Sequence, residues 1–291
     1  MTSLPLFDLP RSTSVDFVPV TAPEHLAGVL CALQGRLLAA DLETTPLPQH
    51  VGAQDAALDP HRSTVRLVQL WPFEGPVYVI DLFRCGVPLA HLHAVLACHL
   101  VFHNATFDLQ YLLQAGILPG GLDCTLLAAI AEGAAIGSRG LADLAASKLG
   151  IEVDKTLPSF AAPSLSPHAL YYAALDALVC GQLWQTICPP WRAYTVLASS
   201  IWAVATMELT GVGFDVEQHR KLTRKNQLQL MALERSLTRL LGDRPTDRHL
   251  RAFISSRVSQ WPRTDSGLLR VDEETLLRYG IEELGIAELE V

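Results

Sequence analysis

Charged residues are scarce in this sequence of 291 residues: they make up 18%, against 49% for hydrophobic residues. A chain with so little charge and so much apolar material folds around a core, which excludes an intrinsically disordered protein. Polar residues interrupt every long apolar stretch, as in LHAVLACHLVFHN, so no membrane-spanning segment is predicted. The N-terminus lacks a basic segment followed by an apolar one, so we expect no secretory leader and a cytoplasmic protein.

Cysteine pairs and the common phosphate and metal motifs are also missing. The six cysteines form no CxxC pair and stand in apolar surroundings, so neither a disulfide framework nor a zinc ribbon is predicted. His91, His93, Cys98, His99 and His103 lie close in sequence, but their spacing matches no compact zinc site. The sequence has no GxxxxGK[ST], GxSxG or HExxH motif, which argues against a P-loop enzyme, a serine hydrolase and a zinc protease.

The net charge of −8 hides an uneven distribution along the chain. Residues 1–190 hold 8 Lys and Arg against 16 Asp and Glu, whereas residues 219–263 hold 11 basic residues against 3 acidic ones. The tail, residues 264–291, is acidic again, with 2 basic and 8 acidic residues. A basic helical stripe of this kind is compatible with a phosphate-binding surface, but the charge alone favours a solvated helix face.

Hydrophobic patterning predicts an α/β fold in the first part of the chain. Strands are expected at 36–45, 65–71, 76–83 and 99–104, and helices at 23–35, 88–98, 106–116, 122–132, 140–149 and 167–187. The short separation of the second and third strands indicates an antiparallel hairpin, so we expect a mixed β-sheet. After Pro189-Pro190 the pattern is helical, at 193–209, 215–241 and 246–258. These features predict two domains, residues 1–190 and 191–291.

Two carboxylates, Asp41 and Glu43, end the first predicted strand, where residues i and i+2 point to the same face. Neighbouring carboxylates repel each other unless a cation lies between them, so the pair suits a divalent ion with oxygen ligands. Taken alone, this common motif favours a strand end with two solvated acids.

Two further acidic residues stand on predicted helices. Asp108 falls in the first turn of a helix that Asn104 or Thr106 can cap, and Tyr172 and Asp176 share one helix face. Each has an ordinary explanation, because an acid in a first turn complements the helix dipole and a Tyr-Asp pair is a common surface contact. Together with the first motif, however, they form the ordered series DxE, NxxxD and YxxxD, which is far more specific than any one of its parts.

This series resembles the motifs of the DnaQ-like 3′-5′ exonuclease superfamily, in its tyrosine-bearing DEDDy branch. The segments LLAADLETT, FHNATFDLQYL and LSPHALYYAALDALV are similar to the proofreading exonuclease domain of family A, DNA polymerase I-like enzymes, and the resemblance covers residues 18–188. It continues in MELTGVGFDVEQH and RPTDRHLRAFISSRV, which resemble the start of the polymerase domain, but no palm follows in this sequence. The resemblance implies an RNase H-like mixed β-sheet flanked by helices, followed by a smaller all-helical region.

By this resemblance, four carboxylates and one tyrosine form the active site. Asp41, Glu43 and Asp176 would hold one divalent ion, Asp41 would contact a second, and Asp108 would lie beside them. Tyr172 would orient the attacking water. Mg²⁺ or Mn²⁺, as two ions, is the expected cofactor because all the ligands are carboxylates. The expected reaction is hydrolysis of DNA from the 3′ end to nucleoside 5′-monophosphates.

The resemblance also implies residues that contact the substrate: Leu42, Thr44, Leu47, Asn104 and Phe107. Leu47 is expected to wedge against the terminal base and Asn104 to support the second motif, while Phe107 either stacks on a base or belongs to the core. The expected partner is DNA, as a single-stranded 3′ end, with RNA as an alternative and no membrane.

Two loops and the helical region leave alternatives open. The stretch LPSFAAPSLS replaces an S-D-W-like sequence that many relatives carry before the third motif, and PLPQHVGAQDAALDPHRST follows the first motif like an insertion. Because such loops border the substrate, an RNase D-like exoribonuclease is one alternative. Another is a subunit that binds DNA 3′ ends and docks a separate polymerase or repair protein through its helices. Families that lose nuclease activity usually lose carboxylates, and here all four are present.

Overall fold

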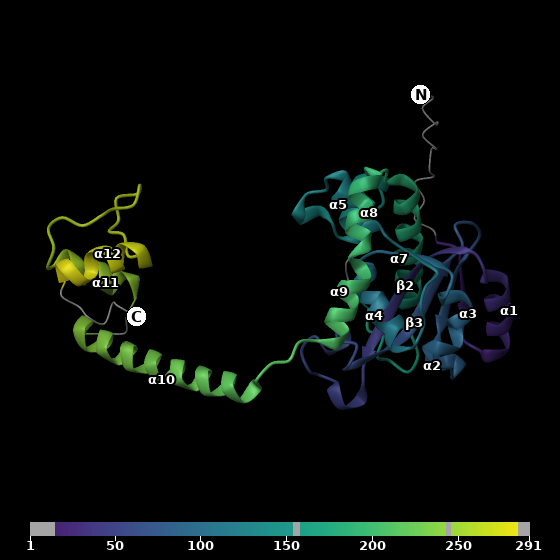
Figure 1. Ribbon diagram of the computed structural model, residues 1–291, viewed down its shortest axis with the longest axis horizontal. Helices are drawn as coiled ribbons and strands as arrows, with labels where there is room; N and C mark the ends of the chain where they lie inside the picture. The colour runs from purple at the N-terminus through teal and green to yellow at the C-terminus, as the bar shows by residue number, and fades with distance from the viewer. Residues whose placement is uncertain (1–14, 154–157, 243–245, 285–291) are drawn as a thin grey trace, which may run out of the picture. The chain divides into compact units, whose positions relative to one another are not determined.

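The computed structural model describes residues 15–153, 158–242 and 246–284, which fall into two compact units. We call residues 1–212 the first unit and residues 213–291 the second unit (Figure 1). None of the helices in these described ranges is long and apolar enough to cross a membrane.

The first unit is built on a six-stranded mixed sheet in the order β1-β4-β3-β2-β5-β6. Strand β3 runs antiparallel to β2 and β4, and the remaining neighbours are parallel. The prediction of a mixed sheet with a hairpin is therefore confirmed. In sheet order the strands are Phe17–Val20, Val77–Asp81, Ser63–Trp71, Leu37–Pro46, His99–Phe102 and Gly121–Cys124.

Helices cover both faces of this sheet (Figure 1). One face packs against α1 (Pro23–Leu33), α2 (Leu82–Cys85), α3 (His93–Leu96), α4 (Ala105–Gln114) and α9 (Ile201–Thr210). The other face packs against α7 (Pro167–Thr186). Helices α5 (Thr125–Glu132), α6 (Leu141–Leu144) and α8 (Trp191–Ser199) form a third apolar cluster with α7. Short helical turns lie at Pro48–His50, Ala56–Leu58, Leu89–Leu92, Ile136–Ser138 and Ala145–Leu149.

Helix α7 lies unusually close to the sheet because the residues between them are small. Ala173 and Ala177 pack against Ala39 of β2, and all three are fully buried. A Cβ atom on Gly181 would lie 2.4 Å from the Trp71 ring, so a larger residue there would push the helix away. This close packing brings the side chains of α7 within reach of β2.

The second unit is helical, as predicted, with α10 (Val216–Leu241), α11 (Asp247–Ser255) and α12 (Glu273–Leu284). Its core is small and contains the buried residues Ile254, Trp261 and Leu269. Helix α10 buries no residue at all, and Asp215 caps it by accepting a hydrogen bond from the backbone N–H of Gln218. Helix α12 was missed by the sequence pattern.

Several predicted helices differ from the structure; the segment 193–209, for example, is divided into α8 and α9 at Ser200. The segment 88–98 is a 3-10 turn followed by the single turn α3, because Pro88 and the reverse turn at Ala97 leave room for little more. The segment 122–132 begins as strand β6, which pairs in parallel with β5 at the edge of the sheet. A strand of 4 residues is too short to show a period, so its pairing partner decides its conformation.

The packing boundary falls after Val212, not after residue 190 as the sequence predicted. Helix α8 is tied to the sheet by Tyr194, whose hydroxyl donates to Asp123 Oδ1 at 2.6 Å and accepts from the Cys124 N–H at 3.0 Å. Helix α9 is tied to α4 by Gln110, which donates to Glu208 at 2.8 Å. Pro189-Pro190 lies in the short connection between α7 and α8 and does not separate two compact units.

Candidate active site

The first two carboxylates lie side by side on β2, in the centre of the sheet. Asp41 pairs with Gln69 of β3 and Glu43 pairs with Leu67, so both acids lie on the face that α7 covers. A β-bulge follows between Glu43 and Thr44, where the register shifts. A bulge bends the strand and re-aims the side chains beside it, which is common next to functional sites.

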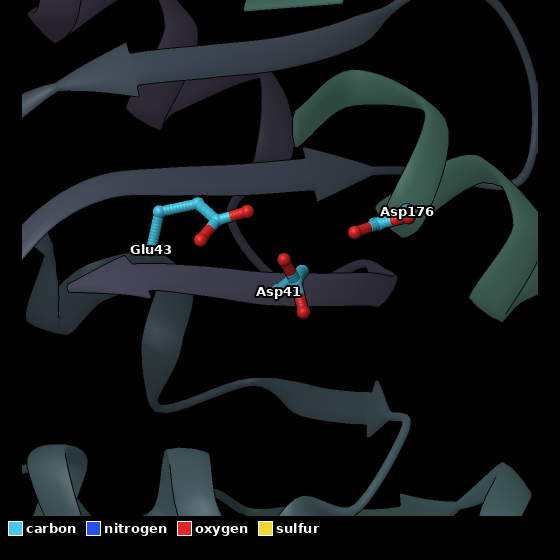
Figure 2. A group of neighbouring side chains, drawn as sticks. All are labelled: Asp41, Glu43 and Asp176. Atoms are coloured by element: carbon cyan, nitrogen blue, oxygen red, sulfur yellow. The ribbon is translucent and has the colours of Figure 1, made fainter. Parts of the chain in front are cut away.

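The third carboxylate, Asp176, comes from α7 on the same face. Ser166 caps this helix by accepting a hydrogen bond from Ala169 N, and Pro167 occupies its first turn, so its start is well defined. Asp176 exposes only 9% of its surface. Figure 2 shows its carboxylate turned toward Asp41 and Glu43.

Asp41, Glu43 and Asp176 form one compact group. Each offers a carboxylate oxygen, and these oxygens all lie within 4.8 Å of one another (Figure 2). A divalent cation needs several oxygen ligands at about 2.0–2.6 Å, and three oxygens this close can surround one. Among the acids, histidines and cysteines of the described residues, these three are the ones whose ligand atoms lie close enough together to hold one metal ion.

Asp108 is buried beside this group, at 2% exposure, in the first turn of α4. Its atom Oδ1 has no hydrogen-bond partner among the described residues. A buried carboxylate oxygen without a donor is costly, and it indicates a missing water or ion. Burial and the charge of Asp41 raise the pKa of Asp108 well above its usual value.

The predicted capping of α4 by a side chain is wrong. Asn104 occupies the N-cap position but makes no side-chain capping bond, because its backbone is left-handed, with φ 61° and ψ 47°. Capping residues normally have an extended backbone, which directs the side chain to the first free N–H groups. The exposed Asn104 thus turns the chain into the helix and leaves its side chain free of that task.

Burial raises the pKa values of these carboxylates, and neighbouring negative charge raises those of Asp41 and Glu43 further. Burial and then the charges of Asp41, Asp176 and Asp108 raise the pKa of Glu43 to about 10. Burial raises the pKa of Asp176 to about 7, and burial with the charge of Asp176 raises the pKa of Asp41 well above its usual value. Without a cation, the group therefore retains protons at neutral pH.

Tyr172 stands one turn before Asp176, half-buried at the same site. Burial, followed by the charges of Asp176 and Glu43, raises the pKa of its hydroxyl. The hydroxyl thus keeps its proton at neutral pH and can serve as a hydrogen-bond donor.

Among the predicted substrate residues, the side chain of Leu42 does not reach the site. It is 4% exposed and belongs to the core on the opposite face from Asp41, because side chains alternate along a strand. The predicted substrate contact is therefore wrong for this side chain. Phe107 packs partly against the same core and meets Tyr111 edge-on, with ring centroids 5.2 Å apart.

Thr44 lies near the end of β2, and Leu47 lies at the start of the insertion-like loop that follows the strand. The Thr44 hydroxyl donates to the Ala57 carbonyl, and half-buried Leu47 donates its N–H to the Arg62 carbonyl at 2.8 Å. The Tyr111 hydroxyl of α4 also donates to Ala57, at 3.3 Å. The loop is thus held in place beside the strand end, with Leu47 at its start.

Arg66 is a structural residue of this region that sequence analysis missed. It is 1% exposed, donates twice to Asp81 at 2.8 and 2.9 Å, and donates to the Ala162 carbonyl at 3.0 Å. These bonds fix the loop before α7 against the sheet, beside the bulge at Glu43. The available signal was the segment VRLVQLW, where an arginine and a glutamine interrupt a buried strand.

Residues 18–189 match the family described as the 3′-5′ exonuclease of DNA polymerase A. The chain belongs to this family. Over 123 residues, 41% of its length, it is 34% identical to DNA polymerase I of Aquifex aeolicus strain VF5. That match spans 21% of the polymerase, so the chain covers about a fifth of this relative.

Solved structures share the exonuclease fold. Brucella melitensis NrnC bound to pGG has a TM-score of 0.53 and 23% identity, over 70% of this chain and 98% of that one. Trypanosoma brucei RNase D has a TM-score of 0.51 and 18% identity, over 66% and 74%. The POL domain of Pol1 from M. smegmatis has a TM-score of 0.63 and 18% identity, over 94% of this chain and 46% of that one. At these identities the likeness shows the fold alone.

Proposed function

We propose that this exonuclease is metal-dependent and hydrolyses DNA from the 3′ end, releasing nucleoside 5′-monophosphates. The observation that carries the proposal is the group of Asp41, Glu43 and Asp176, whose oxygens lie within 4.8 Å of one another. Three acids so close are unfavourable by themselves, which supports a role that needs a cation between them.

The donor set fits Mg²⁺ or Mn²⁺. Both ions prefer carboxylate oxygens, and the unpartnered oxygen of Asp108 adds a fourth buried carboxylate at the same place. Asp41, Glu43 and Asp176 would hold one ion, and Asp41 would contact a second. When bound, two such ions supply positive charge that offsets the negative charge of a phosphodiester during its hydrolysis.

The protein side chains position the attacking water, the carboxylates and the terminal base. The Tyr172 hydroxyl, which keeps its proton, orients the water that attacks the phosphorus. Helix α7 keeps Tyr172 and Asp176 in register, and Arg66 holds the loop before that helix. Leu47, at the start of the loop after β2, wedges against the terminal base.

The test is digestion of end-labelled single-stranded DNA and RNA of matched sequence. We expect DNA shortened from its 3′ end with Mg²⁺ or Mn²⁺, monophosphate products by chromatography, and no cleavage with chelator. Absence of shortening with either ion would overturn the proposal.

RNA is the second candidate substrate. The observation that favours it is the likeness of the fold to RNase D and to NrnC, which was solved with the short ligand pGG. A kcat/KM at least tenfold higher on RNA than on DNA would replace the DNA assignment and keep the metal-dependent nuclease.

A further inference from the structure

Gln69 is a buried glutamine whose side chain has no bonding partner. It lies in the middle of β3 with 0% exposure, and neither Nε2 nor Oε1 has a hydrogen-bond partner within the described ranges. Leaving a buried amide unpaired is costly, so such groups are rare in native proteins. A glutamine here therefore needs an explanation other than stability of the cation-free protein.

Within the sheet, the neighbours of Gln69 on its own face include one polar side chain. On the α7 face of the sheet, Leu67 and Trp71 flank it along β3, and Val79 is its partner on β4. Its partner on β2 is Asp41, directly across the antiparallel pair. Such partners have Cβ atoms about 4.5–5.5 Å apart, which puts the glutamine amide within reach of the aspartate carboxylate.

We propose that Gln69 is a positioning residue for Asp41, and that its amide N–H donates to the ionised Asp41 carboxylate when that carboxylate binds a divalent cation. This inference rests on the proposed function. A second partner of this kind fixes the orientation of a carboxylate ligand and raises its affinity for the cation.

The side-chain type suits this task. An amide donates a hydrogen bond without carrying a charge, so it does not compete with the cation as lysine or arginine would. A further acid at position 69 would add to the repulsion among Asp41, Glu43 and Asp176. A leucine would fill the same space among Leu67, Trp71 and Val79 but would leave Asp41 without a donor.

The test is Gln69→Leu in the full chain, with Mn²⁺ as the probe. Titration calorimetry should show Mn²⁺ dissociation constants about 10- to 100-fold higher than in the wild type. In chelator, the unfolding midpoint should be unchanged or higher, because the variant removes an unpaired buried amide and keeps the volume. The variant should thus lose Mn²⁺ affinity without losing stability.

Gln182→Leu is the matched control. Its atom Oε1 is also buried without a partner in the described chain, and it lies on α7 beyond Asp176. This variant should bind Mn²⁺ like the wild type.

Two outcomes would overturn the inference alone. One is a Gln69→Leu variant that binds Mn²⁺ as tightly as the wild type. The other is a much lower unfolding midpoint of this variant in chelator, because it would show that the Gln69 amide is hydrogen-bonded even when no cation is present. If the wild type binds no Mn²⁺, and if Asp176→Asn does not change the rate of DNA hydrolysis, the proposed function fails as well.

Discussion

The two units of the chain hold their acidic residues in opposite ways. In the first unit, Asp41, Glu43 and Asp176 crowd together, and their pKa values rise, that of Glu43 to about 10. In the second unit, the Asp272 carboxylate accepts hydrogen bonds from the hydroxyl and N–H of Thr275 and from Arg270, which lower its pKa to about 2. An acid whose charge is satisfied by donors supports the local fold, whereas a group of buried acids with raised pKa values indicates a functional site.

The units also differ in what they bury. The first has three large apolar clusters around its sheet, and the second has a small core and a helix, α10, with no buried residue. This suggests that chemistry resides in the first unit and that the second presents a surface. The following experiments can break or sharpen that comparison.

The largest effect is expected from Asp176→Asn, which removes one charge and keeps the shape of the side chain. Hydrolysis of single-stranded DNA should fall by about a thousandfold or more, with an unchanged circular dichroism spectrum. The matched control in the second unit is Asp272→Asn, which should lower the unfolding midpoint slightly and keep the rate. Equal losses of activity in both variants would contradict the division of roles.

Tyr172→Phe should have the next largest effect. Loss of the hydroxyl should reduce kcat about 10- to 100-fold with little change in KM, because in the proposed mechanism the hydroxyl orients a water rather than holding DNA. Steady-state kinetics on a labelled oligonucleotide measure both constants. Tyr78→Phe on β4 is the control, and an unchanged kcat in Tyr172→Phe would remove this residue from the mechanism.

The basic residues of α10 test the second unit. Replacing Arg220, Lys221, Arg224 and Lys225 with Gln should raise KM for DNA about three- to tenfold, keep kcat, and flatten the dependence of binding on salt. The control is the uncharged pair Gln227→Ala and Gln229→Ala on the same helix. An unaltered salt slope would leave α10 as a solvated face or as a docking helix for a separate polymerase, which a pull-down distinguishes.

The smallest effect is expected in the pH dependence of stability without metal. Because the folded-state pKa of Asp176 is raised to about 7, its contribution is fully present below the unfolded value of about 4 and is lost as pH rises through 7. In chelator, the unfolding midpoint should therefore drop by several degrees between pH 5 and pH 8. Mg²⁺ should reduce this drop by binding the ionised acids, and Asp176→Asn should flatten it. A midpoint that rises over this range would contradict the raised pKa values.

Much of the fold followed from patterns along the sequence. The apolar strand before Asp41, the hairpin of β3 and β4 and the long helices α7 and α10 were predicted from residue types and turn signals along the sequence, and the structure contains them. The short edge strand β6 and the broken segment 88–98 have no period, because neighbouring strands and turns decide their conformation. The boundary was placed too early because buried contacts of Tyr194 and Gln110 outweigh the break at Pro189-Pro190.

The site shows the same division. The motifs singled out Asp41, Glu43 and Asp176, and the structure brings these three together. Leu42 was assigned to the substrate by resemblance. Its side chain lies on the opposite face of the sheet from Asp41, because neighbouring residues of a strand point to opposite faces. Arg66 and Gln69 were missed because their roles depend on residues that are distant in sequence: Asp81 and Ala162 for Arg66, and Asp41 for Gln69.

By itself, the sequence determined which residue types recur in order: two acids ending an apolar strand, an acid opening a helix, and a tyrosine one turn before another acid. Only the tertiary structure decided how closely these groups approach, since the distance between β2 and α7 depends on Ala173, Ala177 and Gly181. Repulsion and desolvation depend on that distance and on burial, and neither quantity is local to the chain. The sequence therefore determined the identity of the acidic residues, and tertiary packing determined their raised pKa values.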